Sequence, residues 1–129
     1  MRIRAWFEGM ALAVVVSGCG SDPLAPFEPE INNATDSFQL QATDVRNVSS
    51  TLNYTWRNTG TIANVNHSST TLQGSARLLV RSSNGTQVYD RALAASLTEQ
   101  TAVGASGDWT IQLVLSNYSG TLNFRVQKP

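Results

Sequence analysis

Apolar and polar residues alternate along most of the chain with a period of two. The clearest alternation places Trp109, Ile111, Leu113 and Leu115 on one face. Because successive side chains of a strand point to opposite faces of a sheet, such a stretch predicts a strand with one buried face. Similar stretches predict further strands over residues 38–42, 52–56, 63–67, 76–80 and 122–126.

Residues that favour chain reversal separate the predicted strands. Ser83-Asn84-Gly85-Thr86 contains an Asn-Gly pair, which tolerates the positive φ of a tight hairpin turn. We expect two further reversals, at residues 58–61 and 117–120. Residues 91–100 are ambiguous, because their leucines lie four apart among alanines while their flanks resemble strands. We interpret them as a strand end that runs into a loop.

About seven short strands, with turn signals at roughly 8 to 12 residue intervals, predict an all-β fold: a single antiparallel β-sandwich. The pattern Gly104-x-x-Gly107-x-Trp109, followed by the alternating residues 122–126, resembles the last hairpin of many bacterial extracytoplasmic sandwiches. Those domains have immunoglobulin-like or jelly-roll topology. The resemblance supports the fold and implies no particular function.

The N-terminus has the pattern of an export signal. Arg2 and Arg4 precede an apolar run over residues 10–16, which is too short to span a bilayer comfortably, and small residues follow it up to Cys19. One carboxylate, Glu8, lies before the run and can stay at the membrane interface. The sequence Val16-Ser17-Gly18-Cys19 resembles the lipobox of bacterial lipoproteins.

This resemblance implies cleavage before Cys19 and acylation of its thiol and its new amino group. Membrane attachment would then come from the acyl chains, and stable anchoring requires more than one chain. Because Cys19 is the only cysteine, no thiol would remain for a disulfide, a metal site or a nucleophile. Gly20 and Ser21 follow it in place of the aspartate that favours inner-membrane retention, which implies the outer membrane.

Prolines occur at every third position after the cysteine, at residues 23, 26 and 29. Proline restricts its own φ and biases the preceding residue toward extended geometry, so the stretch predicts a semi-rigid tether. A P-x-x-P ligand for an aromatic groove is the alternative. The expected organisation is a signal peptide over residues 1–18, an acylated cysteine and tether over 19–31, and the sandwich over 32–129.

Charge gives no sign of a nucleic-acid partner. Nine Lys and Arg residues balance nine Asp and Glu residues, and no basic cluster stands out for nucleic acid or anionic lipid. Few lysines protect the predicted strands, so a sheet edge could pair with a strand of a partner. The partner that we expect is an envelope polysaccharide or another exported protein.

The residues that could support catalysis are few. His67 is the only histidine, which argues against an ordinary zinc site, and no Gly-x-Ser-x-Gly elbow accompanies it. The carboxylates show neither a calcium-loop spacing nor a pattern that would place two in one cleft. We therefore expect no enzymatic activity, no metal and no cofactor.

Aromatic residues provide the main alternative. Trp56, Trp109 and Tyr118 could form a platform on which sugar rings stack, as in carbohydrate-binding modules. Both tryptophans share a face with apolar neighbours, which favours the core, whereas Tyr118 falls in a predicted turn. The expected function is a structural or interaction role for a lipid-anchored envelope domain. A carbohydrate-binding module with exposed aromatics is the alternative.

Overall fold

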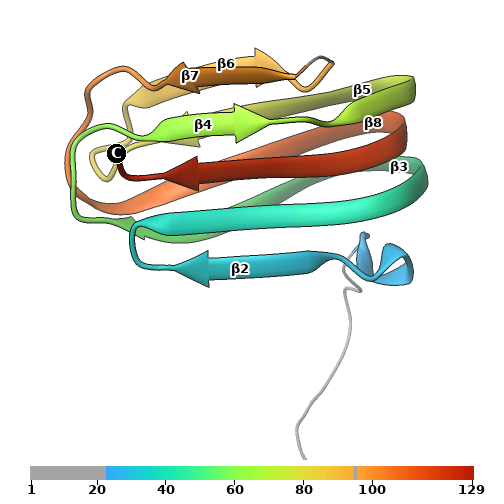
Figure 1. Cartoon of the computed structure of the whole chain (residues 1–129), viewed down its shortest axis with the longest axis horizontal. Coiled ribbons are helices and arrows are strands. Elements are labelled where there is room, and N and C mark those ends of the chain that lie inside the picture. The colour runs from blue at the N-terminus through green and yellow to red at the C-terminus, as the bar shows by residue number, and fades with distance from the viewer. Residues whose placement is uncertain (1–22, 95) are drawn as a thin grey trace, which may run out of the picture.

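The computed structural model describes residues 23–94 and 96–129, so the signal segment and Cys19 lie outside the described residues. No helix in the described ranges is long and apolar enough to cross a membrane. In this part of the chain, one short 3-10 helix precedes seven antiparallel strands (Figure 1). The elements are η1 (Ala25–Phe27), β2 (Glu30–Ala34), β3 (Ser37–Asn58), β4 (Asn64–His67), β5 (Thr70–Arg81), β6 (Gln87–Ala92), β7 (Leu97–Gln100) and β8 (Gly107–Gln127).

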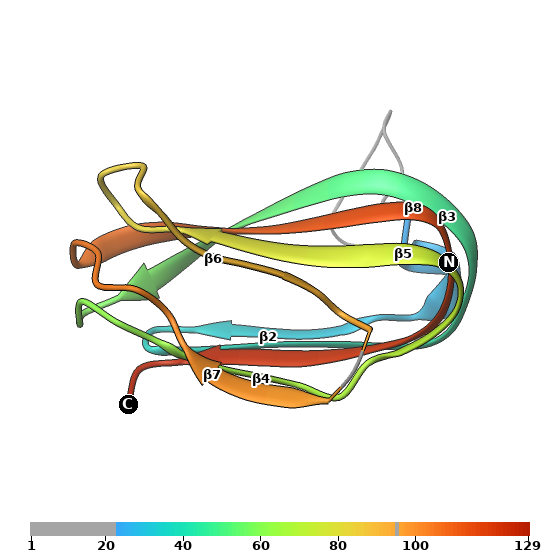
Figure 2. The same cartoon turned by 90° about the horizontal axis from the view of Figure 1, so that it is seen from above.

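One continuous sheet folds over itself to make the two layers of the sandwich. The first layer has the order β2, start of β3, end of β8, β4 and β7, and the second has the end of β3, the start of β8, β5 and β6. In Figure 2 the long strands β3, β5 and β8 curve together at one end, which we call the bend. The all-β sandwich predicted from the sequence is confirmed.

Irregular backbone at the bend lets the strands change layer. The pairing of β3 with β8 shifts register three times between Ala42 and Ser50, and the pairing of β5 with β8 shifts twice between Thr71 and Ser75. Such bulges bend a strand and increase its twist. They use residue types that tolerate positive φ, and these are Asp44, Asn47, Gly74, Asn117 and Gly120.

The reversal expected at residues 117–120 is wrong, and so is the last hairpin suggested there by the resemblance. β8 runs through this segment as one strand. Its buried positions are odd-numbered up to Leu115 and even-numbered from Tyr118 onward, because the bulge adds one residue and shifts the alternation. Asn117 and Gly120, which resemble turn residues, instead bend the strand.

The other predicted reversals and the ambiguous segment over residues 91–100 can be compared with the structure. The Asn-Gly hairpin is confirmed between β5 and β6, where the Ser82 N–H donates to the Thr86 carbonyl at 2.9 Å. A reversal at residues 59–61 joins β3 to β4. Residues 97–100 form a strand rather than the expected loop, since β7 pairs with β4 along its whole length.

Aromatic side chains fill the space between the layers. The Trp56 and Trp109 rings meet edge to face with centroids 5.9 Å apart, and Phe38 stacks on Phe124 at 6.0 Å. These arrangements are preferred for aromatic pairs. The four side chains are fully buried and come from β3 and β8, so these two strands supply the centre of the core.

The folded domain includes residues before the expected boundary at residue 32. Leu24 is fully buried, η1 follows it, and β2 starts at Glu30. Pro26 lies in the first turn of η1, where its missing N–H costs no hydrogen bond. The proline spacing that predicted a tether over residues 19–31 therefore belongs in part to the folded domain.

We expect the bend to depend on Gly120. Its φ is 155°, and a Cβ there would overlap the carbonyl oxygen of Thr70 on β5. Gly120→Ala should lower the free energy of unfolding by about 3 kcal/mol or more, measured by chemical denaturation. Gly85→Ala is the control, because no atom lies within 4 Å of a Cβ there and only the positive φ is penalised, by about 1 kcal/mol. Equal losses for the two variants would contradict this role.

Candidate functional site

The three aromatic residues proposed as a sugar platform lie in the core. Trp56, Trp109 and Tyr118 are each 0% exposed. Each polar atom donates to a backbone carbonyl: Trp56 Nε1 to Ala34, Trp109 Nε1 to Ala105, and the Tyr118 hydroxyl to Thr70. These three residues therefore present no stacking surface, and the core interpretation holds for all of them.

The histidine and two of the aspartates lie on three different strands. His67 is buried on β4, opposite Phe124. Asp90 on β6 pairs with Arg77, while Asp108 at the start of β8 lies 3.4 Å from Arg57. Among the described residues, no group of three or more His, Cys, Asp and Glu side chains could hold a metal ion.

β6 and β7 lie at one long side of the sandwich (Figure 1). A polar groove lies between residues of these two strands. Tyr89 reaches from β6 across the two layers, and its hydroxyl donates to Oε1 of Glu99 on β7 at 2.9 Å. Arg91 Nε lies 3.1 Å from the same oxygen. The groove has a volume of about 340 Å³ and is lined by Gln87, Val88, Tyr89, Asp90, Arg91, Glu99, Gln100 and Ala102.

Electrostatics keep the Tyr89 hydroxyl protonated. Burial raises the pKa of Tyr89, the hydrogen bond to Glu99 and its negative charge raise it further, and Arg91 opposes them. The phenol therefore acts as a hydrogen-bond donor that joins the layers. Backbone bonding adds to this closure, because the Ala102 N–H donates to the Val88 carbonyl at 2.9 Å.

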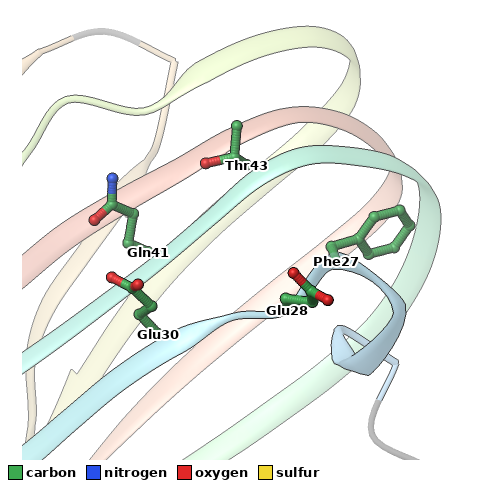
Figure 3. Close-up of a pocket in the computed structure, with 5 residues that line it drawn as sticks. All are labelled: Phe27, Glu28, Glu30, Gln41 and Thr43. Atoms are coloured by element: carbon green, nitrogen blue, oxygen red, sulfur yellow. The ribbon is translucent and has the colours of Figure 1, made fainter.

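A second hollow, of about 220 Å³, lies beside η1 (Figure 3). Glu30 faces Gln41 across the β2–β3 hairpin, and in Figure 3 their polar ends lie side by side. Glu28 adds a second carboxylate, and Phe27 and Thr43 complete the lining. Sequence reasoning missed this grouping, because it assigned both glutamates to the tether and only the hairpin register brings Glu30 opposite Gln41.

The opposite long side of the sandwich exposes a strand edge. The Thr55 carbonyl accepts from Asn33 Nδ2 at 2.9 Å and the Arg57 carbonyl from the Asp36 N–H at 2.8 Å, so these residues turn their backbone away from β8. In an antiparallel pair such residues alternate along the strand. Thr51 and Asn53 therefore also present their N–H and C=O groups at this edge, which we call the β3 edge (residues 50–57).

Apolar side chains accompany the β3 edge. Leu52 and Tyr54 are only partly buried against the core, and Ile31 on the neighbouring β2 is 39% exposed. No charged residue occurs between Arg46 and Arg57. Neither the groove nor this edge carries a motif, but the scarcity of lysine in the sequence indicated that an edge could be open.

The buried Tyr89 hydroxyl and its contact with Glu99 should make the folded domain less stable at alkaline pH. A phenol with a raised pKa in the folded state keeps its proton after the unfolded chain has lost it, so the free energy of unfolding should fall as pH rises above about 10. Tyr89→Phe should reduce this fall, as measured by denaturation at several pH values. Tyr118, whose pKa is also raised by burial, should account for the remainder.

Glu99→Gln tests whether Glu99 contributes to the raised pKa of Tyr89, which is measured by spectrophotometric titration. Removing the negative charge should bring the pKa of Tyr89 closer to its ordinary value, while burial should still hold it above that value. An unchanged titration would show that Glu99 does not contribute.

No family model and no curated protein matches the sequence. One similar solved structure is the crystal structure of a glycoside hydrolase family 43 arabinoxylan arabinofuranohydrolase from Bacillus subtilis in complex with cellotetraose. The match has 14% sequence identity and a TM-score of 0.31, and it covers 75% of this chain and 20% of that chain. The chain thus spans about a fifth of the length of that enzyme, and at this score the likeness supports no inference about function.

Proposed function

We propose that this protein is a lipid-anchored domain of the bacterial envelope that binds a partner protein and performs no catalysis. The lipobox-like sequence ending at Cys19 supports the anchor and the export of the domain, and the residues that follow Cys19 favour the outer membrane. The proximity of the folded domain to this cysteine agrees with the proposal, because Leu24, only five positions later, is already buried.

The β3 edge is the observation that best supports an interaction role. Its outward backbone groups at Thr51 and Asn53 can bond to an added strand, as in β-augmentation. Natural proteins usually protect such an edge with lysine, proline or a bulge. The segment over residues 50–56 contains no charge and no proline, and its pairing to β8 is regular from Ser50 to Asn58.

The contrast between the two long sides of the sandwich strengthens this proposal. On the β6–β7 side, Tyr89, Arg91 and Glu99 connect the layers and the Ala102 N–H occupies the Val88 carbonyl. At the β3 edge, two side-by-side apolar residues, Leu52 and Tyr54, are only partly covered. An added strand would bury these side chains and satisfy the outward backbone groups together.

The partner that fits is an extended segment of another exported protein with alternating apolar residues. Main-chain hydrogen bonds would provide affinity, and alternate side chains of the added strand would contact Leu52 and Tyr54. Residues 50–56 carry no charge, so they impose no charge requirement on that strand. The side chains of Thr51, Asn53 and Thr55, which point to the outer face, would flank it with hydroxyl and amide groups.

Cys19→Ser tests the lipid anchor. Since the variant cannot be acylated at this position, it should lose membrane association, and mass spectrometry should find no acylated N-terminal peptide. Wild-type protein should partition into the detergent phase of a two-phase extraction and the variant into the aqueous phase. A variant that stays in the membrane fraction after a high-salt wash would refute anchoring through Cys19.

Asn53→Pro tests the β3 edge. Proline removes the outward N–H at a position where β8 does not use it, so the domain should stay folded while strand addition is blocked. With a photoreactive amino acid at Thr51 in the anchored protein, wild type should give a cross-linked adduct to a partner and Asn53→Pro should lose most of it.

Asn53→Ala is the matched control. It keeps the backbone N–H and loses only the side-chain acceptor of Gln112 Nε2, which lies 3.0 Å away. This variant should retain the adduct. Equal cross-linking by the proline and alanine variants, with both domains folded by circular dichroism, would rule out strand addition at this edge.

A further inference from the structure

The described chain begins at the bend of the sandwich. Pro26 and Phe27 of η1 line one hollow together with Asp44 and Arg46 of the curved part of β3. Figure 1 shows η1 at the same end as the curves of β3, β5 and β8. The position at which the anchor segment joins the domain is therefore fixed at this end.

The segment between the cysteine and the domain is short. Five residue steps separate Cys19 from the buried Leu24, and an extended chain spans at most about 3.6 Å per residue, so the gap is at most about 18 Å. Residues 107–116 of β8 run about 30 Å from the far end of the sandwich to the bend, at 3.3 Å per residue. An anchor at Cys19 thus keeps the start of the domain, at the bend, within about 18 Å of the acylated cysteine, whereas it does not restrain the opposite end, about 30 Å away along the strands.

An exposed apolar side chain marks this end. Leu72 on β5 is 76% exposed, the largest value among the exposed large hydrophobic residues of the described ranges. It lies in the bulged segment between Thr71, which pairs with Gly120, and Gln73, which pairs with Ser119. Asp44 and Arg46 line the adjacent hollow with it, so the bend presents one leucine beside one acidic and one basic group.

We propose that the bend is a lipid-contact surface, on which Leu72 enters the headgroup region while Arg46 and Asp44 contact zwitterionic headgroups. This proposal rests on the proposed anchor at Cys19. A zwitterionic headgroup carries a phosphate and an ammonium, which complement a guanidinium and a carboxylate, whereas an anionic surface would be repelled by Asp44 and the neighbouring Glu28. On the outer face of the second layer the apolar side chains Leu79 and Val114 are only partly exposed, and polar side chains surround them, among them Thr51, Asn53, Thr55, Thr110 and Gln112, so this face offers no apolar side chain as exposed as Leu72.

Contact of the bend with lipid, which we call end-on docking, has a consequence for the β3 edge. The strands would stand away from the membrane, so residues 50–57 would lie along the side of the domain and remain open to a partner. The far end, with the turns at residues 59–61 and 83–86, would point away from the lipid.

The test uses the full lipidated protein in phosphatidylcholine vesicles that contain a nitroxide-labelled lipid. Single variants Leu72→Cys, Val103→Cys and Thr55→Cys are labelled with a fluorescent dye, since an acylated Cys19 has no free thiol. Val103 is the matched control, because it is 73% exposed and lies near Thr61 at the far end. Thr55 reports on the flat outer face.

The dye at position 72 should shift to shorter emission wavelength and lose most of its intensity to the nitroxide, while the dyes at 103 and 55 should stay close to their values in buffer. Equal quenching at all three positions, or the strongest quenching at 55, would overturn end-on docking and leave the anchor intact. Co-sedimentation with the vesicles is measured first, before the fluorescence. A protein that does not co-sediment would overturn both the anchor at Cys19 and the contact of the bend with lipid.

Discussion

The close approach of three bent strands is the constraint on which the rest of the molecule depends. β3, β5 and β8 each contribute to the bend, and Gly74 and Gly120 lie where a side chain would overlap the backbone of a neighbouring strand. Because the same strands continue from one layer into the other, the bend fixes the distance and alignment of both layers. The core between the layers, with its paired tryptophans, can pack only if the bend is intact.

A sheet folded over itself leaves two long sides, and different contacts connect the two layers on each side. The β6–β7 side is joined by a buried phenol, a carboxylate and a guanidinium. On the opposite side, the β2–β3 hairpin reaches the end of β3, where Asn33 donates to the Thr55 carbonyl and the Asp36 N–H to the Arg57 carbonyl. Beyond these contacts the β3 edge is neutral and regular, which is why the proposed interaction is placed there.

The ends of the sandwich are equally distinct. All curved strands and the entry of the chain lie at one end, whereas the hairpin turns gather at the other. An anchor close to the bend would convert this asymmetry into an orientation, with the β3 edge along the side. The short distance between Cys19 and Leu24 is thus the link between the proposed lipid attachment and the proposed partner binding.

The sequence by itself determined the fold class, the inward faces of the strands and the Asn-Gly hairpin, because these follow from local alternation and local turn chemistry. It did not determine that residues 117–120 bend a strand, since a turn and a bulge use the same residue types and differ only in their distant partners. The burial of Tyr118 could not be predicted for the same reason: its partners, Val48 on β3 and Thr70 on β5, lie far away in the sequence. The groove, the hollow at Glu30 and the open β3 edge exist only through strand register and layer packing, which no local pattern encodes.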